Sequence, residues 1–102
     1  MYLSKHIIMT DSLIDEQKLD LMKKELNGWE CSKDSLIKEL KFKDFIEAFA
    51  FITKLALIAE SMNHHPEWSN VYSQVTIKLT THDLGGVSEL DVKLANAIDR
   101  IL

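Results

Sequence analysis

The sequence predicts an α+β fold: a four-stranded antiparallel sheet with three helices packed on one face, in the order α-β-β-α-β-β-α. Three segments, 12–27, 44–62 and 88–101, have the apolar periodicity of amphipathic helices. Two pairs of short strand-like segments lie between them, and hairpins separated by helices indicate an antiparallel sheet with the helices gathered on one face. The chain of 102 residues is long enough for one core and too short for two domains.

The first helix is predicted over 12–27. Ser12 and Asp15 resemble an acidic variant of the capping box at its start, and Gly28 follows as a stop signal. Its apolar side chains share one face: Leu19, Met22 and Leu26. This spacing favours a helix with a single buried side.

The first hairpin is predicted from strands at 29–31 and 36–42, joined by the polar turn 32–35. Alternating apolar residues support the second strand: Leu36, Leu40 and Phe42. Lys38 interrupts that alternation, because it falls where another apolar side chain is expected.

The central helix is predicted over 44–62. Asp44 and Glu47 fit a capping box at its start, and Pro66 closes the region by pushing His65 out of the α conformation. One broad apolar face is expected to pack on the core: Phe45, Phe49, Ile52, Leu55, Ala56 and Ala59. A second ridge consists of Ile46, Ala50 and Leu57. A helix in a small domain needs one buried face, so this ridge indicates either a helix wedged under a loop or an oligomer interface.

The second hairpin is predicted from strands at 68–72 and 75–81 around Ser73-Gln74. Gly85-Gly86 then interrupts the chain, and Ser88 with Asp91 forms a capping box for the last helix. The apolar side of that helix consists of Leu90, Leu94, Ala97, Ile98 and Ile101.

Composition excludes several classes of protein. The chain has 12 Lys and Arg against 16 Asp and Glu, and this acidic balance argues against a protein that binds nucleic-acid phosphates directly. The single Cys31 allows no intramolecular disulfide, fits a reducing compartment, and is expected to act as a small buried apolar residue. Residues 1–9 are too short and interrupted for a signal peptide, and no apolar run approaches transmembrane length. We expect a cytoplasmic protein without a membrane partner.

Three of the four histidines lie in two segments, 60–68 and 80–83, where regular elements are expected to end. Imidazole exchanges protons near neutral pH, so such a cluster indicates proton-transfer chemistry. Glu60 and His64 are four residues apart at a helix end, and we expect the carboxylate to orient that imidazole. An antiparallel sheet would bring His82 beside His64 and His65 around one cleft.

Other interpretations of these residues remain open. His-His-Pro is commonly a helix stop with rings facing solvent, and three histidines with Glu60 would also suit zinc. Zinc is disfavoured, because neither HExxH nor CxxC spacing is present and no thiolate is available. Trp29 and Trp68 are expected to be core or cleft-wall residues.

Taken together, the chain resembles the pterin-4a-carbinolamine dehydratases, also called dimerisation cofactor of a homeodomain transcription factor. The resemblance covers 11–102 as a single domain, and 1–10 is expected to be a flexible extension that includes His6. The matching positions are Gly28-Trp29, Phe42-Lys43-Asp44-Phe45, Glu60, His64-His65-Pro66, Trp68, Asn70-Val71-Tyr72, Val75, Ile77, Leu79, Thr81-His82, Gly86, Ser88-Glu89 and Asp91.

The resemblance implies dehydration of 4a-hydroxytetrahydropterin (4a-hydroxytetrahydrobiopterin) to quinonoid dihydropterin and water, in tetrahydrobiopterin recycling, without a metal or redox cofactor. It implies catalytic roles for His64, His65 and His82, with His65 as the main acid–base residue. The implied substrate contacts are Asn63, Thr80, Thr81 and Asp83, and the implied supporting residues are Glu60 and Asp91.

The same resemblance implies a homotetramer or homodimer, and a functional link to an aromatic amino-acid hydroxylase. In the tetramer, helices from four subunits would pack together and dimers would join along sheet edges. The alternative function is an interaction module, stabilising a partner's dimer or acting as a transcriptional coactivator through the helix 44–62. Turnover of a synthetic 4a-hydroxytetrahydropterin distinguishes the two.

Overall fold

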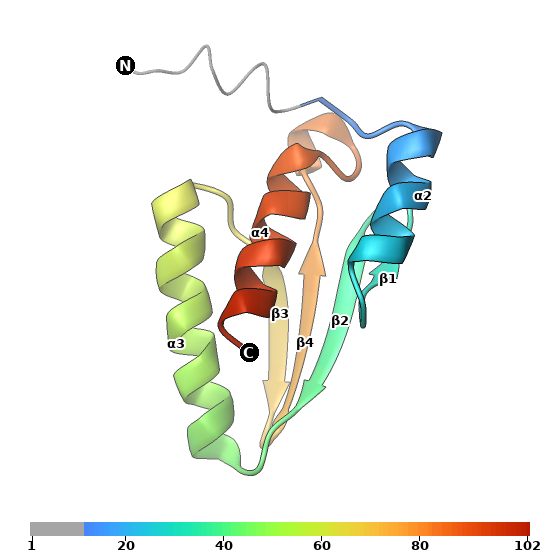
Figure 1. Cartoon of the computed structure of the whole chain (residues 1–102). Helices are drawn as coiled ribbons and strands as arrows, with labels where there is room; N and C mark the ends of the chain where they lie inside the picture. The colour runs from blue at the N-terminus through green and yellow to red at the C-terminus, as the bar shows by residue number, and fades with distance from the viewer. Residues whose placement is uncertain (1–11) are drawn as a thin grey trace.

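The computed structural model describes residues 12–102, so the predicted extension 1–10 with His6 lies outside the described residues. The predicted fold class and element order are confirmed (Figure 1). The elements are α2 (Glu16–Glu25), β1 (Glu30–Cys31), β2 (Leu36–Lys41), α3 (Phe45–Met62), β3 (Glu67–Val71), β4 (Gln74–Leu79), the 3-10 helix η1 (His82–Leu84) and α4 (Glu89–Arg100). Over the described range, no helix is both long and apolar enough to cross a membrane.

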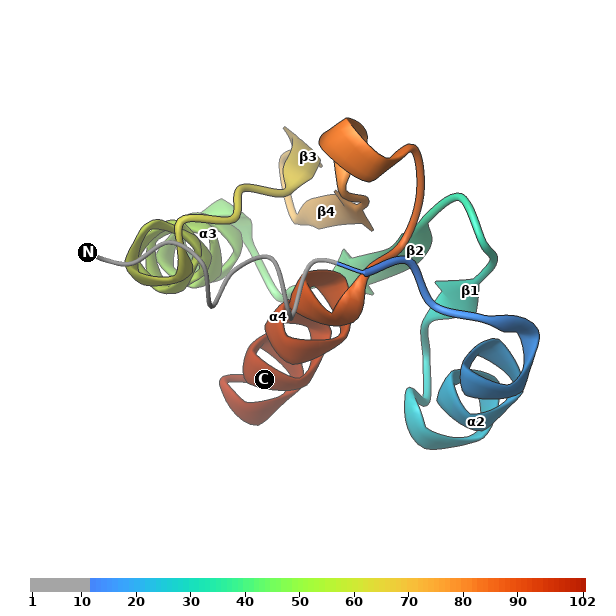
Figure 2. The same ribbon diagram turned by 90° about the horizontal axis from the view of Figure 1, so that it is seen from above.

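The four strands form one antiparallel sheet in the order β1-β2-β4-β3. Leu36 lies opposite Leu79 and Leu40 opposite Val75, which directs these side chains to the helical side of the sheet. Figure 2 shows α4 lying along the middle of the sheet, with α3 toward the β3 end and α2 beside β1. The core lies between these helices and the sheet.

Lys38 points into this helical side and explains the interrupted alternation in β2. Its Nζ atom lies 2.9 Å from Oδ1 of Asp99 on α4, and its side chain is 13% exposed. The indole N–H of Trp29 donates to both oxygens of the same carboxylate, at 3.0 and 3.1 Å. The charge is therefore paired where a lone buried ammonium would be unfavourable, and it ties β2 to α4.

The first helix is shorter than predicted. Asp15, and not Ser12, caps α2, since its Oδ1 accepts a hydrogen bond of 2.8 Å from the N–H of Lys18. The preceding residues are drawn into a different interaction: Leu13 forms an isolated β-bridge with Ser88, and the N–H of Ile14 donates to the carbonyl of Val87. This extended contact prevents the helix from starting at 12.

The apolar faces of α3 also differ from the prediction. Phe45 and Phe49 were expected in the core but are exposed, whereas Ala48 and Phe51 are buried. The reason is that α3 contacts α4 and β4 on one side only, so its buried face is narrower than the apolar stripe. Together with the predicted second ridge, the two phenylalanines form an exposed surface, which we call the α3 ridge: Phe45, Ile46, Phe49, Ala50 and Leu57.

Candidate functional site

The helix α3 ends at Met62, before Pro66 is reached, and Asn63 caps it. Asn63 adopts the left-handed conformation (φ 52°, ψ 40°), which asparagine tolerates better than most residues. Its N–H donates to the carbonyl of Glu60, and the N–H of His64 donates to that of Ala59, both at 3.1 Å. This is the hydrogen-bond pattern of a Schellman motif. His64 therefore no longer follows the helical path of α3, and His65 lies in the irregular connection between α3 and β3.

The second histidine segment, 80–83, lies wholly outside β4, because the strand ends at Leu79 and not at 81 as predicted. Thr81 forms an isolated bridge with Gly86, and the N–H of Thr81 donates to the Gly86 carbonyl at 2.9 Å. A side chain at Gly86 would place its Cβ 2.7 Å from the backbone oxygen of Lys33, so this position requires glycine. The bridge closes a short loop that holds His82 and Asp83 in the turn η1.

These two segments meet at one end of the strands, because the antiparallel neighbour β3 starts beside the residues where β4 ends (Figure 1). A cavity of about 250 Å³ lies between them. The residues that line it are Asn63, His64, His65, Thr80, Thr81, His82 and Asp83. The structure therefore brings together the three histidines and all four residues singled out as substrate contacts.

His64 is held by Asp91, not by Glu60 as expected. Its Nε2 atom lies 2.6 Å from Oδ1 of Asp91, and the two side chains are 11% and 0% exposed. The expected contact between Glu60 and His64 is wrong, because the left-handed turn at Asn63 swings His64 toward the start of α4. Spacing along a continuous helix does not predict this change of direction.

The other two histidines each contact a carboxylate at the molecular surface. Nε2 of His65 lies 2.8 Å from Oε1 of Glu60, and Nε2 of His82 lies 3.1 Å from Oε2 of Glu67. Glu67 was not recognised in the sequence as a site residue. Its link to His82 arises only when the η1 loop folds back beside the start of β3, and no local spacing encodes it.

The hydroxyl groups of the two threonines are engaged with the protein. Thr80 Oγ1 donates to the backbone oxygen of Asp34 at 2.8 Å. Thr81 Oγ1 donates to Oδ2 of Asp91 at 2.8 Å and lies 2.6 Å from Oγ of Ser88. Ser88 was predicted only as a helix cap, and the structure adds this contact behind the cavity.

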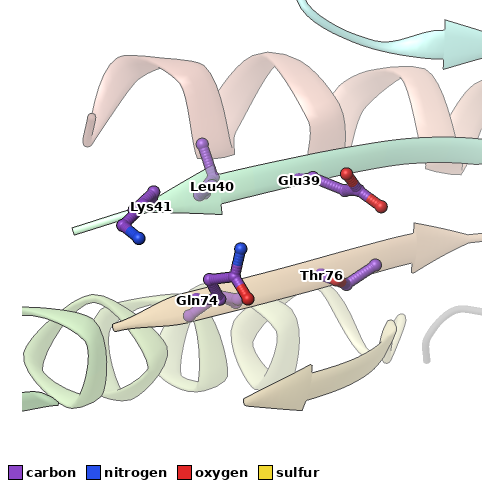
Figure 3. A pocket seen from close by; sticks show the side chains of 6 residues that line it. Glu39, Leu40, Lys41, Gln74 and Thr76 are labelled. Atoms are coloured by element: carbon purple, nitrogen blue, oxygen red, sulfur yellow. The ribbon is translucent and has the colours of Figure 1, made fainter. Parts of the chain in front are cut away.

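Another hollow, of about 300 Å³, lies on the strands β2 and β4. Figure 3 shows Glu39 and Lys41 of β2 beside Gln74 and Thr76 of β4. This hollow contains no histidine, cysteine or buried carboxylate among its lining residues, so the histidine cavity is the better candidate site.

The arrangement of the three histidines suits proton transfer. A carboxylate that accepts from Nε2 of an imidazole favours the tautomer with its proton there and leaves Nδ1 as the acceptor. Each of the three Nε2 atoms faces a different carboxylate. Within residues 12–102, no group of three or more His, Cys, Asp or Glu side chains is arranged to hold a metal ion. The site offers several acid–base groups around one small cavity.

Comparison with known proteins gives a consistent result over almost the whole chain. A family model described as "Pterin 4 alpha carbinolamine dehydratase" matches residues 11–101. A relative from Prochlorococcus marinus, named "Putative pterin-4-alpha-carbinolamine dehydratase", is 52% identical over 93 residues, which cover 91% of this chain and 97% of the relative. A relative of the same name from a Synechococcus species is 51% identical over 90 residues, covering 88% of this chain and 97% of the relative.

Solved structures show the same fold. The crystal structure of a "transcriptional coactivator/pterin dehydratase from Brucella Melitensis" matches with a TM-score of 0.84 and 38% identity, covering 88% of this chain and 98% of that one. A "pterin dehydratase-like protein" described as "a RuBisCO assembly factor in the alpha-carboxysome" shares the fold at 24% identity, with a TM-score of 0.59, covering 72% of this chain and 84% of that one. The chain belongs to the pterin-4a-carbinolamine dehydratase family.

Proposed function

We propose that this protein dehydrates 4a-hydroxytetrahydropterin to quinonoid dihydropterin and water. The observation that carries the proposal is the meeting of His64, His65 and His82 around one cavity in a chain of this family. The natural substrate would be 4a-hydroxytetrahydrobiopterin or a close pterin analogue. An aromatic amino-acid hydroxylase would supply it, and the reaction would return the pterin for recycling.

The reaction needs two proton movements and no change in oxidation state. One group donates a proton to the hydroxyl on C4a, which leaves as water. Another accepts the proton from the adjacent ring nitrogen as the double bond to C4a forms. One proton is donated and one is accepted, so the site as a whole returns to its starting state. Neutral and protonated imidazoles can perform both steps near neutral pH.

We assign the main acid–base role to His65. Its ring lines the cavity and is more exposed than that of His64, and Oε1 of Glu60, 2.8 Å from its Nε2 atom, would orient the ring. His64, which Asp91 holds from behind, and His82, which contacts Glu67, would orient the hydroxyl and relay protons. Glu60 and Asp91 act through the imidazoles and not on the substrate.

The remaining lining residues are proposed as substrate contacts: Asn63, Thr80, Thr81 and Asp83. A cavity of about 250 Å³ lies just below the usual range of about 300–1,000 Å³ for small-molecule sites, so a two-ring pterin without a long side chain is the size of ligand we propose. The amide of Asn63 and the carboxylate of Asp83 are suited to the polar edge of a pterin ring.

The deciding experiment is turnover of a synthetic 4a-hydroxytetrahydropterin, followed by absorbance against the spontaneous reaction in the same buffer. The unmodified protein should accelerate water loss, and the triple variant His64→Ala, His65→Ala, His82→Ala should not. Lys93→Ala, on the exposed side of α4, is the control and should match the unmodified protein. A rate equal to that in buffer alone would contradict the proposal.

The α3 ridge favours a second candidate function, that of an interaction module. Ile46 and Leu57 are 77% and 69% exposed, and Phe45 and Phe49 are exposed beside them. Apolar surfaces of this kind mark protein–protein contacts. We propose that the ridge joins subunits into a homotetramer or homodimer, and that binding to a partner protein or coactivation of transcription is the alternative use. The single Cys31 agrees with action in a reducing compartment such as the cytoplasm.

A further inference from the structure

The buried hydrogen bonds behind His64 can be assigned a unique direction. An ionised carboxylate accepts only, so Thr81 must use its one hydroxyl hydrogen on Oδ2 of Asp91, at 2.8 Å. The contact of 2.6 Å between the hydroxyls of Thr81 and Ser88 is then donated by Ser88. Ser88 Oγ in turn accepts from the N–H of Leu90 at 3.3 Å. The hydrogen bonds therefore form a series in which the N–H of Leu90 donates to Ser88, Ser88 donates to Thr81, and Thr81 donates to Asp91.

Asp91 is fixed at both of its oxygens. Oδ2 accepts from the Thr81 hydroxyl and from the N–H of Ser88 at 2.8 Å, and Oδ1 is left for His64 at 2.6 Å. Asp91 and Ser88 are fully buried and Thr81 nearly so. Because these side chains are shielded from solvent, breaking one of the bonds would leave a buried polar atom unpaired, so the carboxylate has little freedom to rotate or to offer Oδ2 to the imidazole.

We propose that Thr81 and Ser88 are positioning residues for His64, which act by fixing the orientation of Asp91. The hydroxyl chain keeps the proton of His64 on Nε2, so that Nδ1 is the basic nitrogen of this ring. The consequence for turnover rests on the proposed dehydratase function. Thr81 was assigned above as a residue that lines the cavity. Because its hydroxyl donates to Asp91, only the rest of its side chain is available to contact the substrate.

The test is Thr81→Val, which keeps the shape of the side chain and removes the hydroxyl, with Thr81→Ser as the conservative rescue. The first measurement is the tautomer of His64, read from the ¹⁵N resonances of its ring by NMR. In the unmodified protein and in Thr81→Ser, the proton should be on Nε2. In Thr81→Val, a share of the Nδ1–H tautomer should appear. Thr80→Val is the matched control for this measurement, because its hydroxyl bond of 2.8 Å goes to Asp34 and not to Asp91.

The second measurement is turnover. Thr81→Val should lower kcat roughly tenfold or more with a smaller change in KM, as residues that orient metal-bound histidines do when altered. Thr81→Ser should restore most of the rate. Thermal unfolding of each variant separates misfolding from misorientation. If Thr81→Val does not fold, the tautomer of His64 in the unmodified protein still tests the proposal. A proton on Nδ1 of His64 in that protein would overturn it.

An unchanged tautomer and unchanged kcat in folded Thr81→Val would also overturn it. The two proposals fail separately. If the unmodified protein shows no dehydratase turnover, the proposed function is wrong, while the His64 tautomer and its response to Thr81→Val still test the positioning role.

Discussion

The carboxylate of Asp91 contacts both His64 and Ser88: its Oδ1 lies 2.6 Å from Nε2 of His64, and its Oδ2 accepts a hydrogen bond from the N–H of Ser88, the residue that caps α4. One buried carboxylate thus completes the capping box of a helix and orients a histidine of the cavity. Because both roles use the same side chain, a substitution at Asp91 affects the start of α4 and the histidine together.

Asp91→Asn should reduce both activity and stability. The amide keeps the size of the side chain but can present an N–H to His64, which disfavours the Nε2–H tautomer. We expect kcat to fall about 10²–10⁴-fold, the usual contribution of a positioned acid–base group, because the other tautomer of His64 could not take its part in proton transfer. With its N–H toward His64, the amide keeps its oxygen on the bond from the N–H of Ser88, so the fold should lose only the extra strength of a bond to a charged acceptor, about 1 kcal/mol in urea unfolding.

The matched control is Asp20→Asn on the exposed side of α2, which should change neither quantity. Normal kcat in a folded Asp91→Asn variant would show that His64 needs no carboxylate.

His65→Ala tests the main acid–base assignment. Removing a positioned general acid–base group should lower the catalysed rate about 10²–10⁴-fold. The ring is exposed and carries little packing, so circular dichroism and oligomeric state should be unchanged. His64→Ala and His82→Ala are measured alongside. Near-normal turnover in His65→Ala would move the role to whichever of these two variants loses more.

The sequence predicted the fold class and the meeting of the histidines, because both depend on alternation and on antiparallel pairing. The end of one strand must lie near the start of its neighbour, so His82 could be placed beside His64 and His65 from the order of the elements. The capping box of Ser88 and Asp91 is local and was also predictable.

Contacts made by turns and by tertiary packing were not predictable. The carboxylate partner of His64 depends on the left-handed residue Asn63, which redirects the chain by an amount that residue spacing does not contain. Glu67 meets His82 only through the loop closed at Gly86. Phe45 and Phe49 have the periodicity of core residues, and their exposure follows from the neighbours that α3 lacks on one side.

Cys31 should react slowly with thiol reagents. It is partly buried rather than fully buried as expected, and burial raises its pKa above the ordinary value of a thiol, an effect that nearby Lys23 only partly offsets. A raised pKa means less thiolate at a given pH, and thiolate is the reactive form. Alkylation by iodoacetamide near pH 8 should be slower in the folded protein than in the urea-unfolded chain. Equal alkylation rates in the folded and unfolded states would contradict the raised pKa of Cys31.

Activity should survive removal of metal ions. The proposed reaction proceeds by proton transfer between imidazoles and the substrate, and the three Nε2 atoms face three different carboxylates and not a common point. We expect unchanged kcat after exhaustive treatment with a chelator, and no stoichiometric metal in elemental analysis of the purified protein. A tightly held zinc ion whose removal abolishes turnover, and whose return restores it, would overturn this prediction.

Leu57→Glu tests the assembly proposed for the α3 ridge. Leu57 is exposed in the single chain, so the substitution should leave the subunit folded. In an oligomer joined through this ridge, the same carboxylate would be buried without a partner, which is costly. The variant should fall to a dimer or monomer in light scattering, while its circular dichroism is unchanged. Leu21→Glu on α2 is the matched control, because Leu21 is also exposed and lies outside the ridge. A clean monomer for the unmodified protein at micromolar concentration would show that the ridge joins no subunits.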